Sequence, residues 1–164
     1  MALPPSKLKI LPHKLCIYTG NITILPFNVK HDAIEPLGFL IHHKECGKVL
    51  FLTDSYYSPY TFKGLNQIII EANYSQEIVD KKIESGSLHG IVRNRILTSH
   101  LSLETCKKLL LANDLSQVNN IVLIHLSDGN SNEVGFKEEI YQTTQKNVSV
   151  ASPGMEIDFN PTPF

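Results

Sequence analysis

The chain has 164 residues, 42% of them hydrophobic, and a formal net charge of −1. This length and composition fit one ordinary domain that buries its own core. The balanced charge argues against a stable nucleic-acid binder, while a transiently held nucleic-acid substrate stays compatible with it, and no apolar run approaches the roughly 20 residues of a membrane span.

The first part of the chain, residues 7–70, has the pattern of a β-meander. Residues 15–29, LCIYTGNITILPFNV, predict two strands around a Thr-Gly-Asn turn. Residues 37–54, LGFLIHHKECGKVLFLTD, predict two more around Glu-Cys-Gly. A continuously apolar strand, typical of one buried on both faces, is expected from Gln67 to Glu71.

After Asn73 the pattern changes to helices that alternate with buried strands. Ser75 is expected to cap a helix over SQEIVDKKIE. Residues 85–95, SGSLHGIVRNR, are interpreted as a linker, and Ser102 then caps a helix that ends near Asn113. The chain therefore adds an α/β portion to the meander.

The last elements complete a mixed sheet. Residues 119–125 predict a buried strand, Asn132 an N-cap of the last helix, and residues 147–152 a final strand. The predicted class is α/β (α+β), a mixed sheet covered by helices on one face. Residues 1–152 form one domain in this interpretation, and residues 153–164 a C-terminal tail that packs loosely or not at all.

Three scattered cysteines, an odd number without CxxC spacing, predict neither a disulfide framework nor a cysteine zinc site. The amino terminus has no apolar segment followed by a cleavage site. The expected compartment is therefore the cytoplasm.

Three polar side chains follow apolar strands at the point where each strand ends: His31, Asp54 and His125. Imidazole nitrogen and carboxylate oxygen are the ligands of zinc and related divalent ions, and one aspartate can bridge two metals. Taken singly, each residue is more often an ordinary loop residue. The phrase His-Leu-Ser also occurs twice, at His100 and at His125, which suggests that both histidines lie at the rim of a common site.

Five ordered motifs, HDAIEPLGFLI, FLTDSYY, IIIEANYS, SHLS and VLIHLSDGN, together resemble the C-terminal half of a metallo-β-lactamase-fold hydrolase. The closest branch includes ribonuclease Z and related phage and bacterial phosphodiesterases and nucleases. The resemblance extends over residues 7–152. It implies one half of a four-layer αβ/βα sandwich, with a metal site along the rim between its two sheets.

The resemblance also implies roles for single residues. His31 matches the lone histidine ligand, Asp54 the aspartate that bridges the two metals, and His125 the final histidine ligand, with zinc or manganese as the metal. His100 resembles a non-ligand histidine that helps to protonate the leaving group, and Glu71 resembles the acidic residue near it.

The chain departs from this family in the residues that should supply most ligands. Nothing resembles its His-x-His-x-Asp-His motif, and His42 and His43 are adjacent on a predicted strand, so they point to opposite faces. Three ligands divided over two metals would leave both under-coordinated. Tyr56 and Tyr57, which follow Asp54, could narrow the site or stack on a base, and packing under a loop is the favoured interpretation.

Four interpretations stay open. The first is a phosphodiester hydrolase, acting on RNA, DNA or a cyclic nucleotide, that a separate chain completes with the missing N-terminal half. The second is a homodimer that assembles the site from two copies. The third is an inactive remnant that acts as a binding or interaction module. The fourth is a soluble α/β domain with scattered histidines. None of them involves a membrane.

Overall fold

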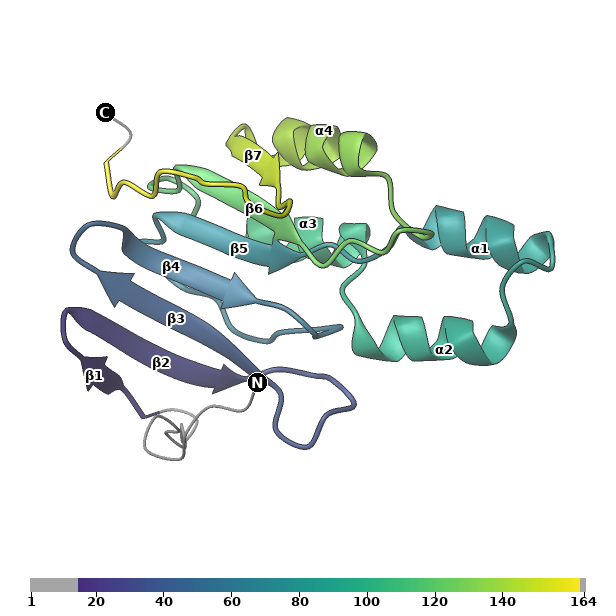
Figure 1. Cartoon of the computed structure of the whole chain (residues 1–164), viewed down its shortest axis with the longest axis horizontal. Coiled ribbons are helices and arrows are strands. Elements are labelled where there is room, and N and C mark those ends of the chain that lie inside the picture. The colour runs from purple at the N-terminus through teal and green to yellow at the C-terminus, as the bar shows by residue number, and fades with distance from the viewer. Residues whose placement is uncertain (1–14, 163–164) are drawn as a thin grey trace.

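The computed structural model describes residues 15–162, which contain one seven-stranded sheet and four helices (Figure 1). Expectations for residues 1–14 and 163–164 lie outside the described residues. The strands are β1 (Ile17–Thr19), β2 (Ile22–Asn28), β3 (Leu37–His43), β4 (Gly47–Leu52), β5 (Gln67–Glu71), β6 (Asn120–Ile124) and β7 (Asn147–Val150). The helices are α1 (Gln76–Glu84), α2 (Gly90–Ser99), α3 (Leu103–Ala112) and α4 (Glu133–Thr144).

The order of the strands in the sheet is their order in the chain, β1 to β7. Strands β1 to β4 are antiparallel neighbours, and β4 to β7 run parallel. The predicted meander, the α/β portion and the mixed sheet are confirmed. Because β4, β5 and β6 are parallel, their carboxyl ends meet at one edge of the sheet.

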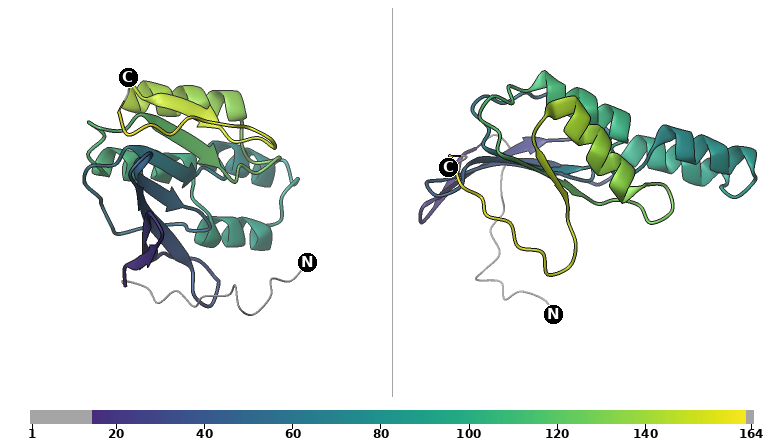
Figure 2. Two further views of the ribbon diagram at one scale, coloured as in Figure 1. Left: turned by 60° about the vertical axis from the view of Figure 1, so that its left-hand side comes forward. Right: turned by 90° about the horizontal axis from the view of Figure 1, so that it is seen from above.

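Helices α3 and α4 cover one face of the sheet, as the view from above shows (Figure 2). Alternate residues of each strand point to that face because the side-chain period of a strand is two. The buried core consists mainly of these strand residues and the inner sides of the two helices: Leu50, Leu52, Ile68, Ile70, Ile121, Leu123, Cys106, Leu110, Phe136 and Ile140. This core holds the parallel strands in fixed register.

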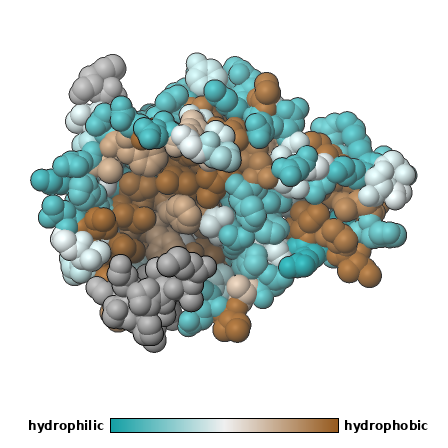
Figure 3. All heavy atoms as spheres, viewed as in Figure 1, coloured by the Kyte–Doolittle hydropathy of each residue, from teal (hydrophilic) through white to brown (hydrophobic). Residues whose placement is uncertain are grey.

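The opposite face of the sheet carries large apolar side chains that stay partly exposed (Figure 3). Strand register places Ile24 beside Ile41, and Phe39 beside Phe51, which in turn lies beside Ile69. The rings of Phe39 and Phe51 are 6.4 Å apart. We call these five residues the open face.

Two of the three predicted helix caps are confirmed at the side-chain level. Ser102 accepts a hydrogen bond from the Thr105 amide, and Asn132 accepts one from the Gly135 amide. Ser75 occupies the N-cap position of α1, but its side chain makes no capping hydrogen bond. Its backbone amide instead donates to the Asn130 carbonyl, which fixes Ser75 without its hydroxyl.

The expected linker over residues 85–95 is wrong, because helix α2 begins at Gly90. The apolar residues at the start of this helix, Ile91 and Val92, are adjacent in sequence and both exposed in the structure, so they form no buried apolar stripe. The N-cap residue His89 also makes no capping hydrogen bond. The two local signals that identify a helix in a sequence are therefore absent here.

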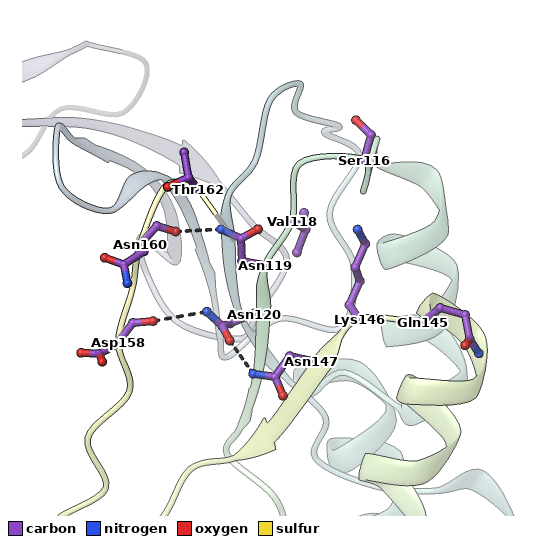
Figure 4. A pocket seen from close by; sticks show the side chains of 10 residues that line it. All are labelled: Ser116, Val118, Asn119, Asn120, Gln145, Lys146, Asn147, Asp158, Asn160 and Thr162. Carbon is purple, nitrogen blue, oxygen red and sulfur yellow. Dashed lines mark hydrogen bonds between the residues drawn. The ribbon is translucent and has the colours of Figure 1, made fainter. Parts of the chain in front are cut away.

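The C-terminal tail also differs from its prediction, since it is hydrogen-bonded to the sheet (Figure 4). The carbonyl of Asn160 accepts hydrogen bonds from Gln67 and Asn119 at 2.6 and 2.8 Å. The carbonyl of Asp158 accepts one from Asn120 at 3.4 Å. Amide side chains at the amino ends of β5 and β6 thus hold this segment in place.

No helix within residues 15–162 is both long and apolar enough to cross a membrane.

Candidate metal centre

The five predicted site residues come together from five separate segments of the chain. Asp54 follows β4, Glu71 ends β5 and His125 follows β6 directly, so all three lie at the edge where the parallel strands end. His31 lies in the loop between β2 and β3, and His100 lies between α2 and α3. We call these five residues the rim cluster.

Short distances connect the members of the rim cluster. His125 Nδ1 lies 3.1 Å from Glu71 Oε1 and 3.4 Å from Asp54 Oδ1. His100 Nδ1 lies 2.8 Å from Glu71 Oε1. His31 Nε2 is 4.0 Å from Asp54 Oδ1, and the His100 ring lies between the other two imidazoles, at 5.6 Å from His31 and 5.0 Å from His125.

Two overlapping groups in the cluster offer three ligand atoms each within 4.8 Å of one another: His31, Asp54 and His100, and Glu71, His100 and His125. This mixture of imidazole nitrogen and carboxylate oxygen fits a divalent transition metal. His100 belongs to both groups, so it lies as close to the other donor atoms as the three predicted ligands do. The donor set therefore fits one metal ion. If two ions were bound, each would have few ligands from this chain.

Two members of the cluster have a strained backbone. Asp54 has φ 49° and His125 has φ 56°, in the left-handed region that residues with a Cβ rarely adopt. Of the other non-glycine residues between 15 and 162, one more, Gln145, shares this conformation. Strain of this kind persists where surrounding structure imposes it, and it clusters at functional sites.

Burial dominates the electrostatics of the cluster. Glu71 is fully buried, and its desolvation raises the pKa of its carboxyl to about 8, although the Ser55 amide donates a hydrogen bond to it at 3.1 Å. Burial also lowers the pKa of His100, and the neighbouring His125 lowers it further. Before any cation binds, the cluster thus favours a neutral carboxyl beside a neutral imidazole.

Sequence reasoning missed Asn73, a buried residue that joins three segments of the site. Its side-chain amide donates to the His125 carbonyl at 2.7 Å, and its own carbonyl accepts from the Ser127 amide at 2.9 Å. Its backbone amide donates to the Leu101 carbonyl, next to His100. Asn73 belongs to the motif IIIEANYS, which was the available signal, but its backbone contacts leave no mark of their own in a sequence.

The favoured interpretation of the two tyrosines after Asp54, packing under a loop, is wrong. Tyr56 is 40% exposed and Tyr57 47% exposed, so neither packs under a loop. The amide of Tyr56 donates to the Lys30 carbonyl at 2.9 Å, and Tyr57 forms an isolated bridge with Lys30. These backbone contacts hold both residues beside the segment of His31, and both stay partly exposed.

Comparison with known proteins gives curated relatives that are named exodeoxyribonucleases and solved structures that share one fold. The chain matches no family model. It is 31% identical over 146 residues to the exodeoxyribonuclease WalJ of Streptococcus pneumoniae, covering 85% of this chain and 51% of WalJ. Its structure resembles YhfI of Bacillus subtilis, a metallo-β-lactamase fold protein, with TM-score 0.62 at 15% identity over 88% of this chain and 53% of YhfI.

The chain has the fold of one part of a metallo-β-lactamase-fold protein. A second structure, Igni18, a metallo hydrolase of Ignicoccus hospitalis, agrees with TM-score 0.60 at 12% identity over 90% of this chain and 58% of Igni18. The chain spans about half the length of these three proteins. The predicted class, an α/β mixed sheet resembling one half of the metallo-β-lactamase sandwich, is confirmed, whereas its place in the ribonuclease Z branch stays a prediction.

Proposed function

We propose that this chain carries part of the active site of a metal-dependent hydrolase that cleaves phosphodiester bonds in nucleic acid. The observation that carries the proposal is the rim cluster, in which three histidines and two carboxylates from five segments lie together on partly strained backbone. The similarity to WalJ, which is named an exodeoxyribonuclease, supports DNA as the substrate class.

His31, Asp54 and His125 are the metal ligands in this proposal, and zinc or manganese is the metal. Bound there, a divalent cation would lower the pKa of a water and neutralise charge that develops on the phosphate. Asp54 is half exposed and lies between the other two, within 4.0 Å of an imidazole nitrogen of each. The same oxygen, Oδ1, makes both contacts, so the Asp54 carboxylate would help to hold a cation beside either histidine.

His100 and Glu71 handle the proton in this proposal. Glu71 contacts Nδ1 of His100 at 2.8 Å, which leaves Nε2 for the leaving group. Burial lowers the pKa of His100, but a substrate phosphate beside the ring acts in the opposite direction, because an anion favours the charged imidazole. His100 would then carry a proton when substrate is present.

The site is completed by a second copy of this chain or by a separate chain with the N-terminal half of the fold. The five residues of the rim cluster form only two groups of three ligand atoms, and each group includes His100. Because His100 handles the proton in this proposal, each group then keeps only two ligands for a metal. The open face supports docking of either partner, because large apolar patches usually mark an interaction surface. An inactive module that keeps only the docking surface is the alternative function.

Native mass spectrometry of the chain with zinc or manganese tests the proposal, because it reports bound metal and subunit number together. We expect metal on the wild-type chain and loss of metal in Asp54→Ala. Asp114→Ala, an exposed substitution in the loop after α3, is the matched control and should keep the metal. Failure of the wild type to bind either metal, alone or as a dimer, would contradict a metal site in this chain alone.

Hydrolysis of a single-stranded oligodeoxynucleotide by the same samples separates the two functions. An active dimer supports assembly from two copies. A monomer that becomes active only with a polypeptide carrying the His-x-His-x-Asp-His motif supports a separate chain. Metal binding without hydrolysis in either case would favour the inactive module.

A further inference from the structure

A cavity of about 470 Å³ lies between the segment after Asp54 and helix α3. Tyr57, Tyr60 and Thr61 form one wall, and Thr105, Lys108 and Leu109 form the other. We call it the tyrosine cavity. None of these six residues belongs to the rim cluster.

The walls of the cavity are held by contacts on both sides. The Phe62 amide donates to Asn113 Oδ1 at 2.7 Å, which ties the tyrosine segment to the end of α3. The ring of Tyr60 packs edge-on against Phe27 at 5.6 Å. Ser55 accepts from the Tyr57 amide and donates to its carbonyl, at 3.3 and 2.8 Å. The cavity is therefore set by the fold and needs little rearrangement on binding.

Both walls begin next to the rim cluster. Tyr57 is three residues after Asp54, so their Cα atoms are at most about 11 Å apart. On the other wall, the Thr105 hydroxyl accepts a hydrogen bond at 3.1 Å from Ser102, two residues after His100. A chain-like substrate held at the rim cluster thus has this cavity within reach of its next unit.

The chemistry of the walls matches a nucleotide. The exposed Tyr57 provides a stacking surface for a base, and the two threonine hydroxyls offer donors and acceptors to its edge. Lys108 is exposed and, unlike Lys107, which pairs with Glu139, forms no ion pair with any residue from 15 to 162. Its ammonium group is therefore free to meet a phosphate.

We propose that the tyrosine cavity binds a base of single-stranded DNA next to the scissile phosphate, with Tyr57 as the stacking ring and Lys108 on the adjacent phosphate. This inference rests on the proposed function and names how its substrate is held. An apolar ring and a single cation favour unpaired over duplex DNA, since a base inside a duplex has no free face for stacking.

Fluorescence anisotropy with a labelled oligo-dT in EDTA tests the proposal without hydrolysis or metal. We expect Tyr57→Ala to weaken binding roughly 5- to 150-fold, the usual range for the loss of one stacked base. Tyr57→Phe should bind like the wild type, because the ring is kept. Tyr18→Ala, which removes an exposed tyrosine of β1 far from the site in the sheet order, is the matched control and should have no effect.

An abasic oligonucleotide of equal length separates base from phosphate contacts. The wild type and Tyr57→Ala should bind it equally, whereas Lys108→Ala should weaken both oligonucleotides and reduce the slope of log affinity against log salt by about one. No measurable binding by the wild type, or an equal loss on both oligonucleotides in Tyr57→Ala, would overturn the subsite. Metal binding in the mass spectrometry experiment would still stand in that case, so the two proposals fail separately.

Discussion

At the scale of single residues, the candidate site contains two residues with a strained backbone, and hydrogen bonds from a neighbouring residue hold one of them in place. Asp54 and His125 adopt backbone conformations that cost on the order of 1–3 kcal/mol each, and such residues persist only when their surroundings impose them. Asn73 supplies this restraint for His125, because its side chain holds the His125 carbonyl and its backbone holds Ser127. The position of a candidate ligand is thus set by a residue with no ligand chemistry of its own.

We expect Asn73→Ala to reduce the free energy of unfolding by about 1–3 kcal/mol, because the partly buried His125 carbonyl loses its hydrogen-bond donor. Asn73→Asp should reduce it further, because it places a charged carboxylate in a buried position against the His125 carbonyl oxygen. Urea denaturation measures both. Asn94→Ala, on the exposed side of α2, serves as the control and should change stability little. Equal stability of all three variants would show that Asn73 does not restrain the site.

The thiols provide a second prediction at this scale. Cys106 is fully buried in the hydrophobic core, and burial raises the pKa of its thiol far above the usual range, whereas Cys16 is exposed and Cys46 partly exposed. We expect two thiols to react quickly with a disulfide reagent and the third only at the rate of unfolding. Cys106→Ala should remove the slow phase alone. A third thiol that reacts as fast in native protein as in urea would contradict this burial.

At the scale of elements, the sequence predicted the strands well because alternation and apolar runs are local signals. It also predicted α3 and α4 through their caps and apolar stripes. Helix α2 was missed because Ile91, 86% exposed, and Val92 face solvent and define no buried side. His31, Asp54 and His125 were predicted because each follows an apolar strand in the sequence. The contacts of Asn73 could not be predicted, because they depend on segments that only the fold brings together.

The tail provides the prediction at this scale. Gln67 is fully buried at the start of β5, donates to the Asn160 carbonyl and accepts from Asn120. We expect Gln67→Ala to destabilise the fold by about 1–3 kcal/mol and to speed amide hydrogen exchange in residues 155–162. Gln117→Ala, at an exposed position, is the control. Unchanged exchange in the tail would mean that these amides do not hold it.

At the scale of the whole molecule, helices cover one side of the sheet and leave the open face on the other (Figures 2 and 3). We expect a hydrophobic dye such as ANS to bind the chain at low micromolar concentration, where association is weakest. Ile41→Glu should reduce the dye signal by at least half, because it places a charge in the patch. His42→Glu, the next residue of β3 and on the other face, is the control.

Sedimentation velocity on the same variants measures self-association. If two copies meet through the open face, Ile41→Glu should be monomeric at concentrations where His42→Glu is dimeric. Dye binding and association that respond equally to both substitutions would assign the apolar surface to another part of the molecule.

The order of the strands has a consequence for synthesis of the protein. Because spatial and sequential order coincide from β1 to β7, each strand that leaves the ribosome finds its neighbour already made. The meander from β1 to β4 can pair as it is made, whereas β6 reaches β5 only after helices α1, α2 and α3 have been made, and long-range parallel pairing of this kind is slow. His125 follows the sixth strand, so a nascent chain has most of its sheet before it has the whole rim cluster, and α4 and β7 are made after it.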